Sequence, residues 1–244
     1  MRERIVFCWS GGKDSALALD RTLRDERYEV AALLTTCNEE LQRVSMHGVR
    51  IALLEAQAQA IGLPLYKVFV SRRSSNEEYG QKMGACLSEL KMMHGISACA
   101  FGDIFLEDLR AWREQNLAQL GLRGVFPIWK LDTRELLREF FSRRFESIVC
   151  CVSDAWLDQS MVGRLLDQTF IDALPMQVDP CGENGEFHSF AFAGPIFRQP
   201  IGFSIGEKIY RPLEGTPTAS GSSAAPASAA PVTRGFWFCD LLPA

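Results

Sequence analysis

The feature that most constrains the fold of this chain is a strand, a glycine-containing loop and a helix in immediate succession near the N-terminus. The apolar run at residues 5–9 is typical of a buried strand, and the apolar spacing of residues 15–26 predicts a helix. Between them stand Ser10, Gly11, Gly12, Lys13, Asp14 and Ser15. The glycines permit close backbone approach, and the start of a helix directs free main-chain N–H groups at an anion. The segment therefore predicts a phosphate-binding site.

Strand-like and helix-like segments alternate along the first half of the chain. Strands are predicted at residues 5–9, 30–36, 65–70, 97–102 and 125–129, and helices at 15–26, 48–61, 77–94 and 106–120. This alternation indicates an α/β fold with a doubly wound parallel sheet. Ligands of such sheets bind at the carboxyl ends of the strands. We expect residues 10–15, 37–47 and 103–110 at that edge.

The chain is expected to contain two folded units and one linker. Residues 1–128 should form a nucleotide-binding domain, and residues 129–214 a smaller substrate-binding α/β domain with helices at 133–144 and 160–173 and a strand at 148–152. Residues 215–232 are rich in Ala, Ser and Pro and predict a disordered linker. The apolar residues 233–244 are expected to return as a strand packed on the body.

Composition excludes several classes of protein. A net charge of −4 over 244 residues carries no electrostatic signature of nucleic-acid binding. No apolar run reaches the length of a bilayer span, and a strand is predicted from the first residues on, so we expect neither a membrane span nor a signal peptide. The eight cysteines lack Cys-x-x-Cys spacing and resemble small buried hydrophobes. These features favour the reducing cytoplasm.

A second polar constellation lies at residues 181–188, which combine Cys181, Glu183, Asn184, Glu186 and His188 with two glycines. Such a cluster is able to bind a cationic group, position ammonia or hold a metal. A polar hairpin turn explains the same residues, because Gly and Asn are common in turns. The local sequence leaves both interpretations open.

Taken together, these motifs resemble a known family. The string at residues 10–15 is not a Walker A loop and is similar to the PP-loop of the ATP pyrophosphatases, whose HUP-like domain belongs to the adenine nucleotide alpha hydrolase-like superfamily. Residues 46–49, 101–104, 182–188 and 194–197 also resemble motifs of the diphthine–ammonia ligases, and residues 101–110 resemble their short bacterial branch. Such enzymes adenylate the carboxylate of diphthine, a modified histidine on elongation factor 2, and ammonia then displaces AMP.

The resemblance implies roles for the residues of the loop. The main chain of Ser10, Gly11 and Gly12 and the side chains of Lys13 and Ser15 would hold the phosphates of ATP. Asp14 would bind Mg²⁺, directly or through water, although capping of the first helical turn is an alternative role. Gly102 and Asp103 are assigned to nucleotide, metal or substrate binding.

Other residues are assigned to the acceptor and to ammonia. Glu183, Glu186 and His188 would act in catalysis with Lys13 and Asp14, by recognising the acceptor or handling ammonium. His47, Arg110 and Asn184 are expected to contact substrate. A structural histidine and a solvated helical arginine remain alternative roles for His47 and Arg110.

The expected activity is that of an amide ligase that converts ATP to AMP and pyrophosphate, with free ammonia as donor and a carboxylate as acceptor. No membrane or nucleic-acid partner is expected, and a homodimer is left open. A PP-loop enzyme that modifies tRNA by sulfur or amine transfer is one alternative, for which Cys181 would be the reactive residue. A regulatory module that binds ATP without turnover is the other.

Overall fold

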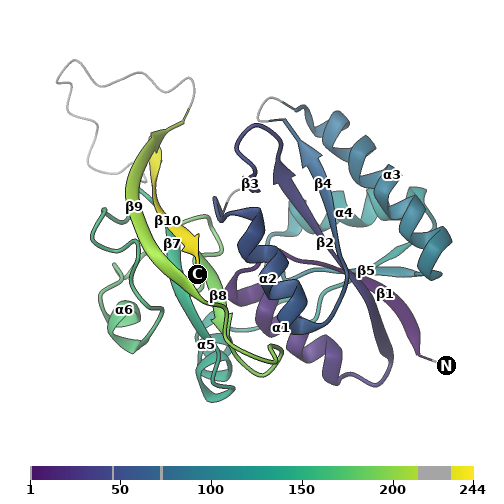
Figure 1. Ribbon diagram of the computed structural model, residues 1–244, viewed down its shortest axis with the longest axis horizontal. Coiled ribbons are helices and arrows are strands. Elements are labelled where there is room, and N and C mark those ends of the chain that lie inside the picture. Colours follow the sequence, from purple (N-terminus) through teal and green to yellow (C-terminus); the bar gives the residue numbers. More distant parts are fainter. Residues whose placement is uncertain (1, 46, 72–73, 214–231) are drawn as a thin grey trace.

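The computed structural model describes residues 2–45, 47–71, 74–213 and 232–244, which form two sheets (Figure 1). The strands of the first sheet are short apolar runs joined by helices, so they pair in parallel. They are β1 (Glu3–Cys8), β2 (Tyr28–Asn38), β4 (Leu65–Val70), β5 (Ala98–Ala100) and β6 (Arg123–Val125). β4 and β1 flank β2, β5 follows β1, and β6 follows β5. The short β3 (Arg43–Val44) pairs antiparallel with the end of β2.

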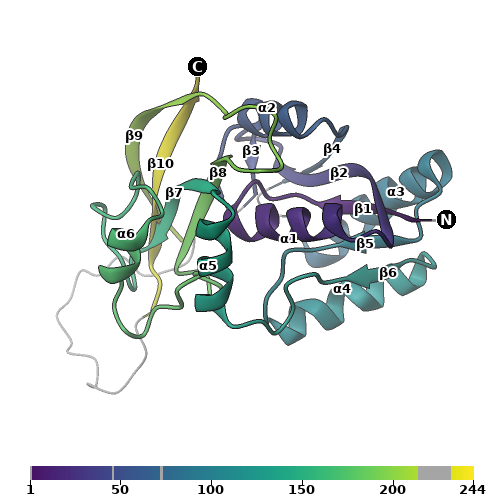
Figure 2. The ribbon, with the colours of Figure 1, turned by 90° about the horizontal axis from the view of Figure 1, so that it is seen from below.

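Four helices cover the two faces of this sheet (Figures 1 and 2). They are α1 (Lys13–Arg24), α2 (Ile51–Ile61), α3 (Asn76–His94) and α4 (Glu107–Gln119). Alternate residues of β1 point to opposite faces. Ile5 and Phe7 pack in the core that contains α1 and α2, whereas Val6 packs in the core that contains α3 and α4. The structure thus confirms the predicted α/β fold.

The second sheet is antiparallel, in the order β8-β7-β10-β9. Its strands are β7 (Glu146–Ser153), β8 (Phe187–Ala193), β9 (Phe203–Pro212) and β10 (Gly235–Pro243). Helices α5 (Thr133–Ser142) and α6 (Gln168–Asp172) accompany it. The apolar core on the α1 side of the first sheet continues without a break into β7 and β8. Figures 1 and 2 show the second sheet on that side.

Ion pairs also join the two sheets. Asp240 in β10 accepts from Arg43 at 2.8 Å and from Arg50 at 2.6 Å, which ties the last strand to the segment before α2. Burial raises the pKa of Asp240, but the hydrogen bonds from the two guanidinium groups outweigh it and hold the pKa at about 2. Asp20 in α1 pairs with Arg143, which follows α5, at 2.7 Å.

Several predicted elements have different bounds in the structure, and two of them differ most. The helix predicted at residues 160–173 begins only at Gln168, because Gly163 adopts a φ of +81° and Leu165 forms a β-bridge with Ile148. The strand predicted at residues 125–129 ends at Val125, and Pro127, which has no N–H to donate, stands in the turn that follows. Met46 of the predicted family motif and residues 215–231 of the predicted linker lie outside the described residues.

Candidate active site

The loop between β1 and α1 lies at the carboxyl edge of the first sheet and has a fixed internal geometry. The hydroxyls of Ser10 and Ser15 lie 2.7 Å apart, and the main-chain N–H of Gly12 donates to Ser10 Oγ at 3.3 Å. Gly12 is the N-cap residue of α1 and supplies no side-chain acceptor to the helix. The positive end of the helix dipole is therefore directed at the space in front of the loop.

The carbonyl of Gly11 fixes the back of the loop to the second sheet. It accepts from the main-chain N–H of Ala191 in β8 at 2.9 Å and from Nε2 of Gln57 at 3.0 Å. Gln57 is fully buried in α2 and also accepts from Nε1 of Trp9 at 2.9 Å. Gly11 has a φ of +80°, and a Cβ atom there would meet Gln57 Oε1 at 2.7 Å. Sequence reasoning missed Gln57, because α2 also contains Gln59 and the sequence alone does not show which of the two amides is buried.

Lys13 connects the loop to the polar turn that precedes β8. Its ammonium donates to Asp14 Oδ2 at 2.8 Å and to the carbonyl of Cys181, and it lies 5.1 Å from the centre of the Phe187 ring. Burial lowers the pKa of Lys13, but the negative groups around it, led by Asp14, outweigh burial and raise it. Lys13 is thus a permanent positive charge that is 97% shielded from solvent in a site suited to an anion.

The main chain of the loop after β5 lies against the main chain at the start of α1. A Cβ atom on Gly102 would lie 3.0 Å from the Ser15 nitrogen and 3.1 Å from its Cα. The next residue, Asp103, pairs with Arg113 of α4 at 2.7 Å, and the guanidinium of Arg113 lies 4.3 Å from the centre of the Phe101 ring. Sequence reasoning missed Arg113, because its contact with Asp103 depends on the direction of α4.

The turn before β8 presents Glu183 and is organised by Glu186. Oε1 of Glu183 accepts from the main-chain N–H of Ile104 at 2.8 Å, so the acidic turn meets the loop after β5. Burial, assisted by the charge of Asp14, raises the pKa of Glu183 to about 7. The carboxylate of Glu186 is buried and accepts from both nitrogens of Asn184, at 2.9 and 3.1 Å. Glu186 therefore holds the turn that carries Glu183 and Asn184.

The side chains of two histidines contact each other next to Gly12. The rings of His47 and His188 have centroids 4.6 Å apart, and a Cβ atom on Gly12 would lie 2.9 Å from His47 Cε1. Burial lowers the pKa of His47 to about 4 and that of His188 well below its usual value. Among the described residues, His47 Nδ1 and His188 Nε2 have no hydrogen-bond partner. Both imidazoles are neutral at pH 7, and each keeps a nitrogen available.

These groups surround a cavity of about 720 Å³, which we call the loop cavity. The size suits a nucleotide together with part of an acceptor. Gly11 and Glu186 lie behind its wall. The predicted site residues that line the cavity, with Arg113, are Ser10, Gly12, Lys13, Asp14, Ser15, His47, Gly102, Asp103, Glu183, Asn184 and His188.

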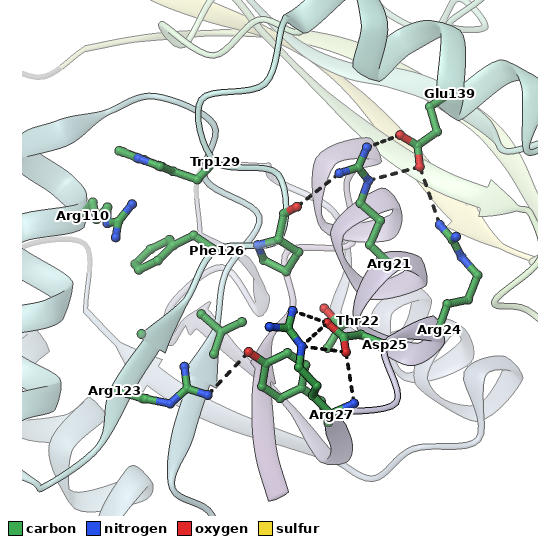
Figure 3. A pocket seen from close by; sticks show the side chains of 14 residues that line it. Arg21, Thr22, Arg24, Asp25, Arg27, Arg110, Arg123, Phe126, Trp129 and Glu139 are labelled. Atoms are coloured by element: carbon green, nitrogen blue, oxygen red, sulfur yellow. Dashed lines mark hydrogen bonds and ion pairs between the residues drawn. The ribbon is translucent and has the colours of Figure 1, made fainter. Parts of the chain in front are cut away.

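Arg110 lies in a different cavity, of about 760 Å³, between the C-terminal end of α1 and the turn after β6 (Figure 3). Its guanidinium lies 4.5 Å from the centre of the Phe126 ring and 4.7 Å from that of Trp129, and it pairs with Glu114 at 2.9 Å. The structure therefore does not bring Arg110 to the phosphate loop, since its guanidinium packs against the turn after β6. The other four arginines of this cavity also pair with carboxylates: Arg21, Arg24, Arg27 and Arg123.

A parallel α/β sheet whose anion-directed loop and acidic turn face one cavity defines an enzyme of the PP-loop class. Family comparison agrees with this geometry. The chain belongs to the diphthamide synthase family: the family's N-terminal domain matches residues 3–124, and its C-terminal domain matches residues 132–218. It is accordingly a ligase that forms C–N bonds and uses ATP. The resemblance inferred from the motifs is confirmed.

Curated relatives match more than four fifths of the chain. The diphthine–ammonia ligase of Rattus norvegicus is 26% identical over 84% of this chain and 85% of its own length. The human diphthine–ammonia ligase is 26% identical over 81% of this chain and 82% of its own length. A solved structure, the U34-tRNA thiolase NcsA from Methanococcus maripaludis, matches 57% of this chain and 55% of its own with 13% identity and a TM-score of 0.35.

Proposed function

We propose that this ligase activates a carboxylate with ATP, forming an acyl-adenylate and pyrophosphate, and that ammonia then displaces AMP to leave an amide. One observation carries the proposal: the phosphate-type loop and the acidic turn with Glu183 line the same cavity. By analogy with the relatives' name, diphthine on elongation factor 2 is the proposed acceptor. The eight cysteines, all within the described residues, are free thiols, which fits a reducing cytoplasm.

In the first step, an oxygen of the acceptor carboxylate attacks the α-phosphorus of ATP, and the bond from that phosphorus to the oxygen bridging to the β-phosphate breaks. Negative charge grows on the departing pyrophosphate. Lys13 and the N-terminus of α1 stabilise it without rearrangement, because both are already fixed in the wall of the cavity. Ser10 and Ser15 supply hydroxyl donors to the same phosphates.

The loop cavity contains a carboxylate, that of Asp14, which is suited to bind a magnesium ion. Asp14 lies in the first turn of α1, its side chain is 27% exposed, and it lines the cavity beside Lys13. Mg²⁺ in nucleotide sites commonly takes one or two carboxylates and completes its shell with phosphates and water. Asp14 would therefore hold an ion that neutralises phosphate charge. Gly102 and Asp103 would border the nucleotide from the loop after β5.

In the second step, ammonia attacks the acyl carbon, the bond from that carbon to the AMP oxygen breaks, and the nitrogen loses a proton. Glu183 is the proposed proton acceptor, since its pKa of about 7 suits a group that both takes up and releases protons near neutral pH. Neutral His47 and His188 offer nitrogen atoms to the acceptor or to ammonia, and Asn184 borders the acceptor. Glu186 acts by positioning the turn.

The sulfur-transfer alternative depends on Cys181. This thiol is buried, donates to the carbonyl of Thr133 at 3.3 Å, and has its pKa raised by burial, which are features of an inert cysteine. We therefore expect Cys181→Ser to retain activity. Loss of turnover with intact ATP binding in this variant would support sulfur transfer instead.

The decisive test measures AMP and pyrophosphate released from ATP and Mg²⁺, with and without ammonium and an elongation factor 2 that carries diphthine. We expect AMP formation to require both, to be lost in Lys13→Ala, and to survive in Lys82→Ala, which removes a lysine paired with Glu78 on the surface of α3. ADP in place of AMP would contradict the mechanism. ATP binding without AMP under any acceptor would favour the regulatory module.

A further inference from the structure

Two thiols meet beneath the loop cavity. Cys8 is the last residue of β1 and Cys99 lies in the neighbouring strand β5, and their sulfur atoms are 3.7 Å apart. Cys99 pairs in register with Val6, two residues before Cys8, so both thiols point to the same face of the sheet. Cys99 is fully buried, whereas Cys8 is half-buried and lines the loop cavity. One thiol is thus open to small molecules and the other stands directly behind it.

Each of the two cysteines lies a few residues before a segment that lines the loop cavity. The residue after Cys8 is Trp9, and the phosphate loop follows. Three residues after Cys99 comes Gly102, whose backbone contacts that of Ser15. Any change in the spacing of Cys8 and Cys99 therefore moves the two segments that meet at the start of α1.

We propose that Cys8 and Cys99 form an oxidation site that a peroxide reaches through the loop cavity. The thiolate of Cys8 attacks one oxygen of hydrogen peroxide, the O–O bond breaks, and a sulfenic acid and hydroxide form; the hydroxide takes up the thiol proton as water. The sulfur of Cys99 then attacks the Cys8 sulfur, and the hydroxyl leaves with the Cys99 proton as a second water. Two thiols and one peroxide thus give one disulfide and two water molecules.

Closure of this disulfide reduces ATP binding. A disulfide bond is about 2.05 Å long, so the two sulfurs must approach by more than 1.5 Å from their present 3.7 Å. The main chain of Gly102, three residues after Cys99, lies close against that of Ser15, so a backbone shift that brings the two cysteines together disturbs this contact. The phosphate loop must therefore distort. This consequence rests on the proposed function, whereas formation of the disulfide does not.

Treatment of the reduced full-length protein with hydrogen peroxide, followed by thiol counting and peptide mapping, tests the site. We expect the eight free thiols to fall by two and a peptide linking Cys8 to Cys99 to appear. ATP affinity, measured by calorimetry, should fall at least tenfold and return with dithiothreitol. Cys86→Ala is the matched control, because Cys86 is also partly exposed and packs in the same core. This variant should respond as the wild type does.

Cys99→Ala should give no linked peptide and should keep its own starting ATP affinity after peroxide. Cys8→Ala is the second variant, should Cys99→Ala fail to fold. Absence of the linked peptide in the wild type, or equal loss of affinity in either variant, would overturn the oxidation site. If the reduced wild type binds no ATP, the proposed function fails instead, and thiol mapping still decides on the disulfide.

Discussion

The rings of His47 and His188 lie with centroids 4.6 Å apart, and both imidazoles are neutral at pH 7 because burial lowers the pKa of each. His47 comes from the segment before α2 and His188 from β8, so each sheet contributes one ring to the loop cavity. The pair therefore joins the two parts of the molecule at the point where substrate is proposed to bind.

Acidification should weaken the fold through these rings. The folded-state pKa of His47, about 4, lies below its ordinary value of 6.5, so the unfolded chain takes up protons first as the pH falls between these values. Stability is therefore lost from pH 6.5 down to 4. We expect His47→Gln to lose less than the wild type over this window, as followed by thermal unfolding at each pH. Parallel curves for the two proteins would contradict the assigned pKa.

The pH dependence of amide formation should report Glu183. At a fixed concentration of free ammonia, the rate should rise through pH 7 as this carboxyl ionises. Glu183→Gln should lower the rate by about 10²- to 10⁴-fold and remove the inflection. Glu135→Gln, an exposed change in α5, serves as the control and should leave the profile unaltered. An inflection near pH 7 that survives in Glu183→Gln would assign it to another group.

Gly102→Ala should damage the phosphate loop. The new Cβ atom would lie 3.0 Å from the Ser15 nitrogen and 3.1 Å from the Ser15 Cα, and both are backbone atoms rather than the end of a flexible side chain. We expect ATP affinity to fall at least tenfold, with a loss of stability of about 1–3 kcal/mol. Gly84→Ala is the matched control, since a Cβ atom there meets nothing within 4 Å in the middle of α3, and it should stabilise the protein by about 0.5–1 kcal/mol. Equal ATP affinity in the two variants would contradict the close approach.

Asp240→Asn should loosen β10. The folded pKa of about 2 lies below the ordinary 3.8, so the carboxylate contributes stability above pH 3.8 that is lost as the pH falls through 2. The shift corresponds to about 2 kcal/mol at neutral pH. Denaturant unfolding at pH 7 should show a loss of that order in Asp240→Asn, and the difference from the wild type should shrink near pH 2.5. A difference that persists unchanged at low pH would point to packing rather than charge.

Local sequence patterns predicted the parts of the fold that are determined by residues close together in sequence. The phosphate-type loop needs only a strand, two glycines and a helix start, and these stand within a few residues of one another, from Cys8 to Ser15. The alternation of strand-like and helix-like segments likewise predicted the parallel sheet, because the spacing of apolar residues within each segment indicates whether it is a strand or a helix.

Local sequence patterns did not predict the contacts between segments that are distant in sequence. Gln57 is hidden in an apolar helix, and its role depends on the second sheet lying against α2. Arg110 and Arg113 lie one turn apart on α4, yet only Arg113 meets Asp103, since Arg110 packs on Phe126 and Trp129. Spacing alone does not distinguish these two arginines.

The bonds at the Gly11 carbonyl couple binding to the integrity of the whole molecule. Because Ala191 of β8 and Gln57 of α2 both hold this carbonyl, the second sheet cannot separate without releasing the phosphate loop. A nucleotide seated on that loop should therefore raise the melting temperature of both sheets together, in a single transition. The molecule would respond to its ligand as one cooperative unit, although its family is described as two domains.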